Sequence, residues 1–205
     1  MITLEGGDGC GKTTQAGLLA GKLRRKGFPV LHTREPGGTP FAEALRKLIL
    51  NPAFRIHPLT EILLYEASRA QHTEEVIRPA LARKKIVVCE RYFDATTAYQ
   101  GYGRGLNLKT VAALNAIAAN KLRPDLTLCL EIPEREARLR TANKKKDRLE
   151  REDRAFRRRV WRGYLAIAKK ESGRVKVISA VGSVEEVGEK VWKEVMKKLR
   201  GAKGV

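Results

Sequence analysis

Gly6-Gly7-Asp8-Gly9-Cys10-Gly11-Lys12-Thr13 is the stretch of this sequence that decides the fold. It matches the pattern G-x-x-x-x-G-K-[ST], a short apolar run precedes it, and a helical pattern follows it directly. Glycines let successive backbone N–H groups face one centre, so such a loop can hold the phosphates of a nucleotide. The helix that follows would add the positive end of its dipole to the same anion. The sequence therefore predicts a nucleoside triphosphate site near residue 12.

Short β-branched runs alternate with longer amphipathic stretches along the whole chain, which is typical of an α/β domain with a parallel sheet. No internal repeat, low-complexity tract or linker interrupts this pattern, so we expect a single domain over residues 1–205. The expected strands are 2–5, 29–33, 86–89, 126–131 and 175–178, and the expected helices are 12–26, 40–50, 59–84, 107–121, 134–141, 150–171 and 184–199.

The chain has 205 residues, a hydrophobic content of 42% and a formal net charge of +19, with basic residues concentrated in 134–176. Such a charge fits nucleic-acid binding, a site for two anionic nucleotides, or a solvated helical face, and charge alone does not decide among them. No apolar run approaches the roughly 20 residues that span a bilayer, so no membrane association is expected. Three cysteines without metal spacing or even pairing favour a reducing, cytoplasmic setting.

The polar stretch 140–148 breaks helical periodicity between two expected helices. It is either a surface turn or a mobile lid over phosphates, and the pattern alone leaves both open. We place the candidate lid at about 138–150.

The third expected strand ends in Glu90-Arg91, beside the predicted phosphate loop. A carboxylate at this position can hold the hydration shell of Mg²⁺, together with the hydroxyl of Thr13, and the adjacent arginine can reach a phosphate. The motif N-K-x-D, which reads guanine in G proteins, does not occur in the sequence. The expected metal ligands are Thr13 and Glu90.

Six further motifs make the sequence similar to one family, the thymidylate kinases (dTMP kinases). They are TREPGGT at 33–39, LYEASR at 64–69, ERY at 90–92, AYQGYGRG at 98–105, PDLTL at 124–128 and DRLE at 147–150. They occur in that family's order and cover nearly the whole chain. The resemblance implies a P-loop NTPase-type fold with a five-stranded parallel sheet flanked by helices and a helical lid. It also implies a homodimer that transfers the γ-phosphoryl group of MgATP to dTMP.

The resemblance also assigns roles to individual residues. Tyr65 matches the aromatic that stacks on thymine, and Arg69 matches the donor to thymine O4, where cytosine presents an amino group instead. Tyr99 matches the ring beneath the sugar, and Arg46 with Arg91 matches the pair that grips the acceptor phosphate. The expected dTMP-binding residues are Asp8, Pro36, Arg46, Tyr65, Arg69, Arg91, Thr96, Tyr99 and Gln100. The expected ATP-binding residues are Gly6, Gly7, Asp8, Gly9, Cys10, Gly11, Lys12, Thr13 and Thr14.

The sequence departs from the family pattern at two places. The strand-end carboxylate is usually Asp, whereas Glu90 here is one methylene longer. Some members carry a catalytic arginine within the phosphate loop, where this chain has Gly9, and others supply it from the lid. Because lysine lacks the two-pronged donor geometry of arginine, the lid cation is not fixed by the sequence. The expected catalytic residues are Lys12, Arg91, Arg138 and Lys144.

Two alternatives remain at this point. Another pyrimidine nucleoside-monophosphate kinase or a deoxynucleoside kinase would share most of these motifs. A nucleic-acid-binding P-loop ATPase would use the basic 134–176 segment and would show salt-sensitive binding to DNA or RNA. The pair Arg46 and Arg91 favours an acceptor that already carries a phosphate over a deoxynucleoside. Nucleic acid is not an expected partner.

Overall fold

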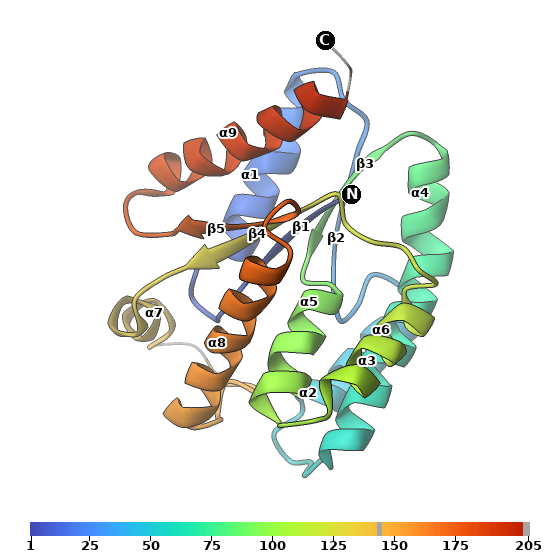
Figure 1. Ribbon diagram of the computed structural model, residues 1–205, viewed down its shortest axis with the longest axis vertical. Coiled ribbons are helices and arrows are strands. Elements are labelled where there is room, and N and C mark those ends of the chain that lie inside the picture. The colour runs from blue at the N-terminus through green and yellow to red at the C-terminus, as the bar shows by residue number, and fades with distance from the viewer. Residues whose placement is uncertain (143–144, 203–205) are drawn as a thin grey trace.

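A computed structural model describes residues 1–142 and 145–202, in which five parallel strands form one sheet (Figure 1). The strand order is β2-β3-β1-β4-β5, with β1 in the middle, paired to β3 and β4. This order confirms the predicted sheet and brings the carboxyl ends of β1 and β3 together. The strands are β1 Ile2–Gly6, β2 Val30–Arg34, β3 Ile86–Glu90, β4 Leu126–Glu131 and β5 Val175–Ser179.

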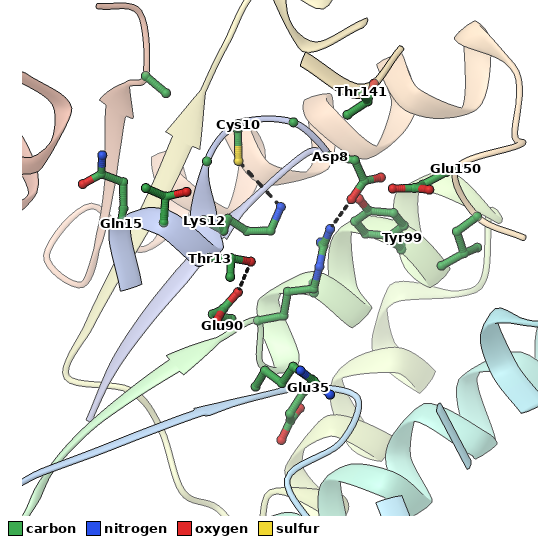
Figure 2. A pocket seen from close by; sticks show the side chains of 18 of the residues that line it. Asp8, Cys10, Lys12, Thr13, Gln15, Glu35, Glu90, Tyr99, Thr141 and Glu150 are labelled. Atoms are coloured by element: carbon green, nitrogen blue, oxygen red, sulfur yellow. Dashed lines mark hydrogen bonds and ion pairs between the residues drawn. The ribbon is translucent and has the colours of Figure 1, made fainter. Parts of the chain in front are cut away.

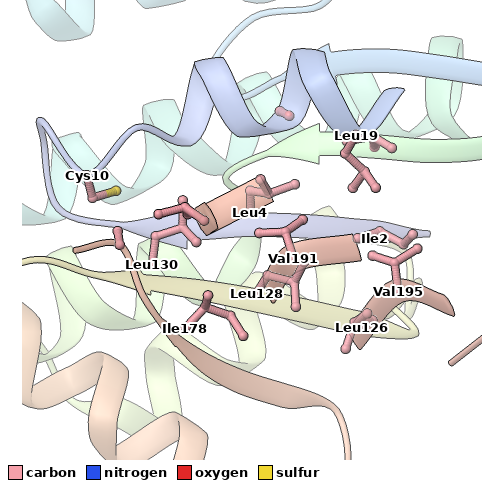
Figure 3. Close-up of a cluster of buried hydrophobic side chains, with 14 of the residues drawn as sticks. Ile2, Leu4, Cys10, Leu19, Leu126, Leu128, Leu130, Ile178, Val191 and Val195 are labelled. Atoms are coloured by element: carbon pink, nitrogen blue, oxygen red, sulfur yellow. The ribbon is translucent and has the colours of Figure 1, made fainter. Parts of the chain in front are cut away.

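Helices α1 (Lys12–Arg25) and α9 (Val184–Ala202) lie side by side on one face of the sheet (Figure 1). Successive residues of a strand point to opposite faces of the sheet. Leu4, Leu128 and the apolar residues two positions away from them therefore point to this face. They pack against Leu19 of α1 and Val191 of α9 in one buried apolar cluster (Figure 3). The cluster fixes the start of α1, and therefore the phosphate loop, against the end of β1.

The opposite face is covered by α8 (Arg154–Lys170), by the short helix α5 (Phe93–Thr96) and by the π-helical segment η2 (Thr97–Gly103). Phe156, Val160 and Tyr164 of α8 pack here against Tyr99 of η2. Four more of the described helices lie on this side (Figure 1). They are α2 Pro40–Leu50, α3 Pro58–His72, α4 Arg78–Ala82 and α6 Leu108–Ala118. One of them, α4, packs directly on β3, where Ala80 shares a buried cluster with Val87.

The structure differs from the sequence-based helices in three places. The expected helix 59–84 is divided by a π-helical segment, η1 (Thr73–Ile77), just before Pro79, which has no backbone N–H to give to a helix. Residues 93–103 are helical although no helix was expected there. The expected helix 150–171 begins only at residue 154, where the Asp153 side chain accepts a hydrogen bond from the Phe156 N–H at 2.6 Å.

Helix α7 (Glu134–Thr141) occupies the start of the predicted lid, as the periodicity indicated. Residues 143 and 144 lie outside the described residues, so the structure does not place the predicted catalytic residue Lys144. Among the helices that the structure does describe, none combines the length and the apolar character that crossing a bilayer requires.

Candidate active site

A cavity of about 700 Å³ opens at the carboxyl ends of β1 and β3 (Figure 2). The phosphate loop and the first turn of α1 line one end, and residues of α2, α3 and η2 line the other. Most predicted site residues meet in this single cavity. The predicted residues that line it are Asp8, Gly9, Cys10, Gly11, Lys12, Thr13, Thr14, Pro36, Arg46, Tyr65, Arg69, Glu90, Arg91, Thr96, Tyr99 and Gln100.

The phosphate loop has the curled backbone that its glycines allow. Gly9 and Gly11 have φ values of 77° and 86°, in the left-handed region that glycine adopts without a Cβ penalty. The ammonium of Lys12 bonds back to the carbonyl oxygens of Gly6 at 3.0 Å and Gly7 at 2.7 Å. These carbonyl oxygens hold the Lys12 ammonium inside the curled loop. The outer phosphates of a bound nucleotide would replace them as its hydrogen-bond acceptors.

Gly9 lies directly beneath helix α7. A Cβ atom at this position would stand 2.8 Å from the carbonyl oxygen of Ala137 and 3.0 Å from a methyl group of Thr141. Any side chain here would collide with the backbone of α7. Helix α7 therefore leaves no room for a side chain at position 9, in the loop.

The two predicted metal ligands lie next to each other. The Thr13 hydroxyl donates to Oε2 of Glu90 at 2.6 Å, and Figure 2 shows both side chains directed into the space below Lys12. The other carboxylate oxygen, Oε1, lies 3.1 Å from Nε2 of His32 on the neighbouring strand β2. His32 thus orients the longer glutamate side chain, a contact that the sequence analysis did not predict.

Arg91 follows directly after β3 and turns toward the phosphate loop. Its backbone has a φ of 65°, which is unusual for a residue with a side chain. The guanidinium donates to Oδ1 of Asp8 at 2.8 Å and to the hydroxyl of Tyr164 at 3.3 Å, and lies over the ring of Tyr99. Burial opposes ionisation of Asp8, but the charges of Arg91 and Lys12 outweigh it and hold the pKa of Asp8 below its ordinary value.

A fully buried carboxylate, Glu5 on β1, lies behind this arrangement. It accepts hydrogen bonds from the Tyr92 backbone N–H at 2.7 Å and from the Tyr164 hydroxyl at 2.9 Å. Burial, assisted by the nearby charge of Asp94, raises the pKa of Glu5 to about 7. Tyr164 therefore links a carboxyl that titrates near neutrality to the guanidinium of Arg91.

Arg69 is held by a buried network on the side of the cavity that faces α3. Its guanidinium donates to Glu35 at 2.8 Å, to Glu66 at 2.8 Å and to Asn115 at 3.1 Å. A further N–H donates to Thr96 at 2.9 Å. Since a guanidinium has five N–H donors, one remains without a protein partner among the described residues, and the side chain lines the cavity.

The remaining acceptor-side residues surround the same space. Arg46 donates to the carbonyl oxygen of Pro36 at 2.9 Å, and Pro36 follows a cis peptide bond with Glu35. Burial raises the pKa of the Tyr65 hydroxyl and of the Tyr99 hydroxyl. Both phenols therefore stay neutral and can offer ring faces beside an anionic ligand.

Of the expected residues that the structure describes, three do not line the cavity. Gly6 and Gly7 contact Lys12 through their carbonyl oxygens, and Arg138 of α7 is not among the lining residues, whereas Arg140 is. Sequence reasoning missed a second wall, formed by the turn between β5 and α9. Arg140 could have been identified from the sequence as another basic residue of the candidate lid. The turn between β5 and α9 carries no motif that could have indicated its place at the cavity. The lining residues outside the expected site set are Gln15, Arg34, Glu35, Leu50, Tyr92, Ala95, Arg140, Thr141, Asp147, Leu149, Glu150, Ala180, Gly182, Ser183, Val184 and Val187.

Comparisons with known proteins agree with this geometry. A family model described as "Thymidylate kinase" matches residues 4–191. A thymidylate kinase from Synechococcus sp. (strain JA-3-3Ab) is 48% identical over 202 residues, covering 98% of each chain. One from Caldanaerobacter subterraneus subsp. tengcongensis is 45% identical over 203 residues, covering 99% of this chain and 98% of that one. The crystal structure of thymidylate kinase from Ehrlichia chaffeensis superposes with a TM-score of 0.79 at 36% identity, covering 95% of this chain and 97% of that one.

Proposed function

Since the chain belongs to the thymidylate kinase family, we propose that it transfers the γ-phosphoryl group of ATP to dTMP, giving dTDP and ADP. The observation that carries this proposal is the single cavity, which has a phosphate loop at one end and an arginine-lined pocket with Tyr65 at the other. Two nucleotides placed end to end in it would bring their phosphates together between Lys12 and Arg91.

At the donor end, the loop amides and Lys12 bind the β- and γ-phosphates of ATP. Thr13 and Glu90 offer the hydroxyl and carboxylate oxygens that Mg²⁺ prefers, and a magnesium site with few protein ligands and several waters fits them. When bound, the ion would neutralise charge on the β- and γ-phosphate oxygens. Residues 180–184 close the donor end opposite α1 and would enclose the base of ATP.

At the acceptor end, Arg46 and Arg91 hold the phosphate of dTMP. The second pKa of a phosphate monoester is about 6, so the attacking oxygen is already anionic near neutral pH and needs no general base. Catalysis then rests on in-line positioning and on cations placed around the transferring group. Arg91 is oriented for this by Asp8 and Tyr164.

The base would lie between Tyr65 and the Arg69 network. The ring of Tyr65 stacks on the pyrimidine, the free N–H of Arg69 donates to O4, and Gln100 makes a second base contact. Tyr99 lies beneath the sugar, where a ribose 2′-hydroxyl would collide with it. Thr96 and Pro36 complete the acceptor pocket, Thr96 by fixing Arg69 and Pro36 by fixing Arg46.

The lid supplies the last cations. We assign this role to Arg138 and Lys144, with Arg140 as an additional candidate because it already lines the cavity. Closure of the lid over the phosphates would exclude water and limit wasteful hydrolysis of ATP.

We also propose that the chain folds as one nucleoside-monophosphate kinase domain, acts in the cytoplasm and forms a homodimer. Buried free cysteines at 10, 89 and 129 fit a reducing compartment. Exposed aliphatic side chains on neighbouring helices α3 and α6 offer a face for a second copy. Light scattering of the purified protein tests the dimer. The exposed aliphatic side chains of α3 and α6 are Leu59, Leu63, Leu108 and Ile117.

A coupled assay of ADP release tests the reaction. Turnover is measured with dTMP, dUMP, dCMP, UMP and GMP as acceptors at saturating ATP and Mg²⁺, and dTMP is expected to give the highest kcat/KM. Weak rejection of dUMP agrees with the proposal, because one methyl group in an apolar pocket gives only about 10- to 200-fold discrimination. Best turnover with a purine acceptor would contradict it.

A further inference from the structure

Glu61 of α3 is a buried carboxylate on which three side chains converge, and its side chain is 0% exposed. Oε1 accepts from Nε2 of Gln100 at 2.8 Å and from Nε of Arg104 at 3.0 Å. Oε2 accepts from Nη2 of Arg104 at 3.0 Å and from Nη1 of Arg148 at 2.6 Å. Burial disfavours its charge, but the hydrogen bonds from Arg104 and Gln100 outweigh it and hold the pKa of Glu61 below its ordinary value.

An ionised carboxylate can only accept hydrogen bonds, so Glu61 decides which end of the Gln100 amide faces it. The NH₂ group must point to Glu61, and the carbonyl oxygen must point the other way. The side chain of Gln100 lines the cavity, and its carbonyl oxygen has no partner among the described residues. Gln100 therefore presents a hydrogen-bond acceptor to the cavity and not a donor.

Pyrimidines differ at the edge that this acceptor would meet. Thymine and uracil carry an N3–H donor, whereas N3 of cytosine has a lone pair and no hydrogen. A carbonyl oxygen accepts a hydrogen bond from the N3–H of thymine or uracil, but it repels the N3 lone pair of cytosine. Leaving a buried polar group without a hydrogen bond costs binding free energy. Arg69 adds a donor near the 4-position, so the two side chains together would match one donor and one acceptor on the base.

We propose that Glu61 determines which pyrimidine the enzyme accepts, by fixing the amide of Gln100 with its carbonyl oxygen toward the base. Glu61 is a positioning residue, since it acts through Gln100 and lies behind it. The inference rests on the assignment of the Tyr65–Arg69 end of the cavity to the acceptor nucleotide.

The variant Glu61→Gln tests this role. A glutamine at 61 can donate as well as accept, so the Gln100 amide is free to turn its NH₂ group toward the base. Arg104 would keep its ion pair with Glu152 at 2.6 Å, and Arg148 would keep the carbonyl of Ile49 at 2.8 Å, so both arginines retain partners. We expect the ratio of dTMP to dCMP affinity, measured by calorimetry, to fall by about 10- to 100-fold.

Two matched variants separate orientation from damage. Glu152→Gln makes the same chemical change on the other carboxylate of Arg104 without touching Gln100, and it should leave the ratio unchanged. Glu61→Asp keeps a carboxylate that can only accept, and it should preserve the ratio even if both affinities fall. If Glu61 had only a structural role, its replacement would weaken the binding of dTMP and dCMP equally. An unchanged ratio of dTMP to dCMP affinity in folded Glu61→Gln therefore overturns the proposal.

A modified nucleotide provides the second measurement. In 3-methyl-dTMP a methyl group replaces the N3–H, so the unaltered protein should bind it at least about 10-fold more weakly than dTMP. If Glu61→Gln does not fold, this comparison decides: equal binding of the two nucleotides overturns the inference, and weak binding of the methylated one supports it. Failure of the unaltered protein to bind dTMP at all would instead contradict the proposed function.

Discussion

Arg91 grips the carboxylate of Asp8 at 2.8 Å although 83 positions separate the two residues in the sequence. The grip joins the end of β3 to the phosphate loop. The left-handed backbone of Arg91 costs about 1 to 2 kcal/mol for a residue with a side chain, so the surrounding contacts must hold it. Asp8 on one side and Tyr164 on the other provide these contacts, and together they hold the guanidinium at the cavity wall.

Replacing Arg91 by lysine tests whether the orientation of its guanidinium matters. Arg91→Lys keeps the charge but loses the fork that joins Asp8 to Tyr164. We expect kcat/KM for dTMP to fall by about 100-fold or more, while KM for ATP changes by less than about threefold. Steady-state kinetics with each substrate varied in turn measures both. The exposed Arg83→Lys is the control, and equal activity of the two variants would contradict the role of Arg91.

Glu5 should make the stability of the protein depend on pH in a recognisable direction. Its pKa rises from the ordinary 4.5 to about 7 on folding, so between these values the folded protein binds the proton more tightly than the unfolded chain. Stability is then lost as pH rises through this window, by up to about 3 kcal/mol from this group. Glu5→Gln removes the titration, so this loss should disappear in the variant.

Chemical denaturation at about pH 5 and about pH 8 measures the difference. All other titrating groups are shared by the two proteins and cancel in the comparison. The unaltered protein should lose stability relative to Glu5→Gln on going to the higher pH. An identical pH dependence of both proteins would show that Glu5 titrates as an ordinary carboxyl.

The phosphate loop and all the strands could be predicted because their signals are local. Glycine spacing marks the loop, and the β-branched runs mark the buried strands within a residue or two of their observed ends. The helical segment 93–103 could not be predicted in this way, because Gly101 and Gly103 are poor helix formers. A Cβ at Gly101 would stand 2.7 Å from Leu108, and one at Gly103 would stand 2.7 Å from Phe156. Packing against distant elements stabilises this segment, and no local pattern records it.

The site also divides into residues that local motifs predict and partners that only the fold brings to them. Residues within the motifs were placed in the cavity by the fold as expected, whereas their supporting partners were not visible in the sequence. His32 lies outside every quoted motif, yet it contacts Glu90 on the neighbouring strand β3. Glu61 lies within a helix and has no motif, yet it contacts Gln100 and Arg148 from two other segments. Such pairs arise from the order of strands and the packing of helices, which sequence spacing does not encode.

His32 should influence the metal site through Glu90. Without the imidazole, the longer glutamate loses the contact that holds one oxygen away from Thr13, so the carboxylate becomes less ordered. We expect His32→Leu to raise the Mg²⁺ concentration for half-maximal activity by about 10-fold, as second-shell changes do. The dTMP to dCMP preference should not change. His57→Asn, at the start of α3, is the control, and an unchanged Mg²⁺ requirement in His32→Leu would refute the connection.

The contact between the phosphate loop and the lid can be tested with a pair of neighbouring glycines. Gly9→Ala places a methyl group 2.8 Å from the carbonyl oxygen of Ala137 and forces a left-handed alanine, so α7 must move away from the loop. A Cβ at Gly7 would meet nothing within 4 Å, which makes Gly7→Ala the matched control within the same loop. Because α7 carries Arg138 and Arg140, we expect kcat of Gly9→Ala to fall by about 10-fold or more relative to Gly7→Ala. Hydrogen exchange of the α7 amides in the absence of nucleotide should also be faster in Gly9→Ala. Equal kcat and equal exchange in the two variants would mean that the position of the lid helix does not depend on Gly9.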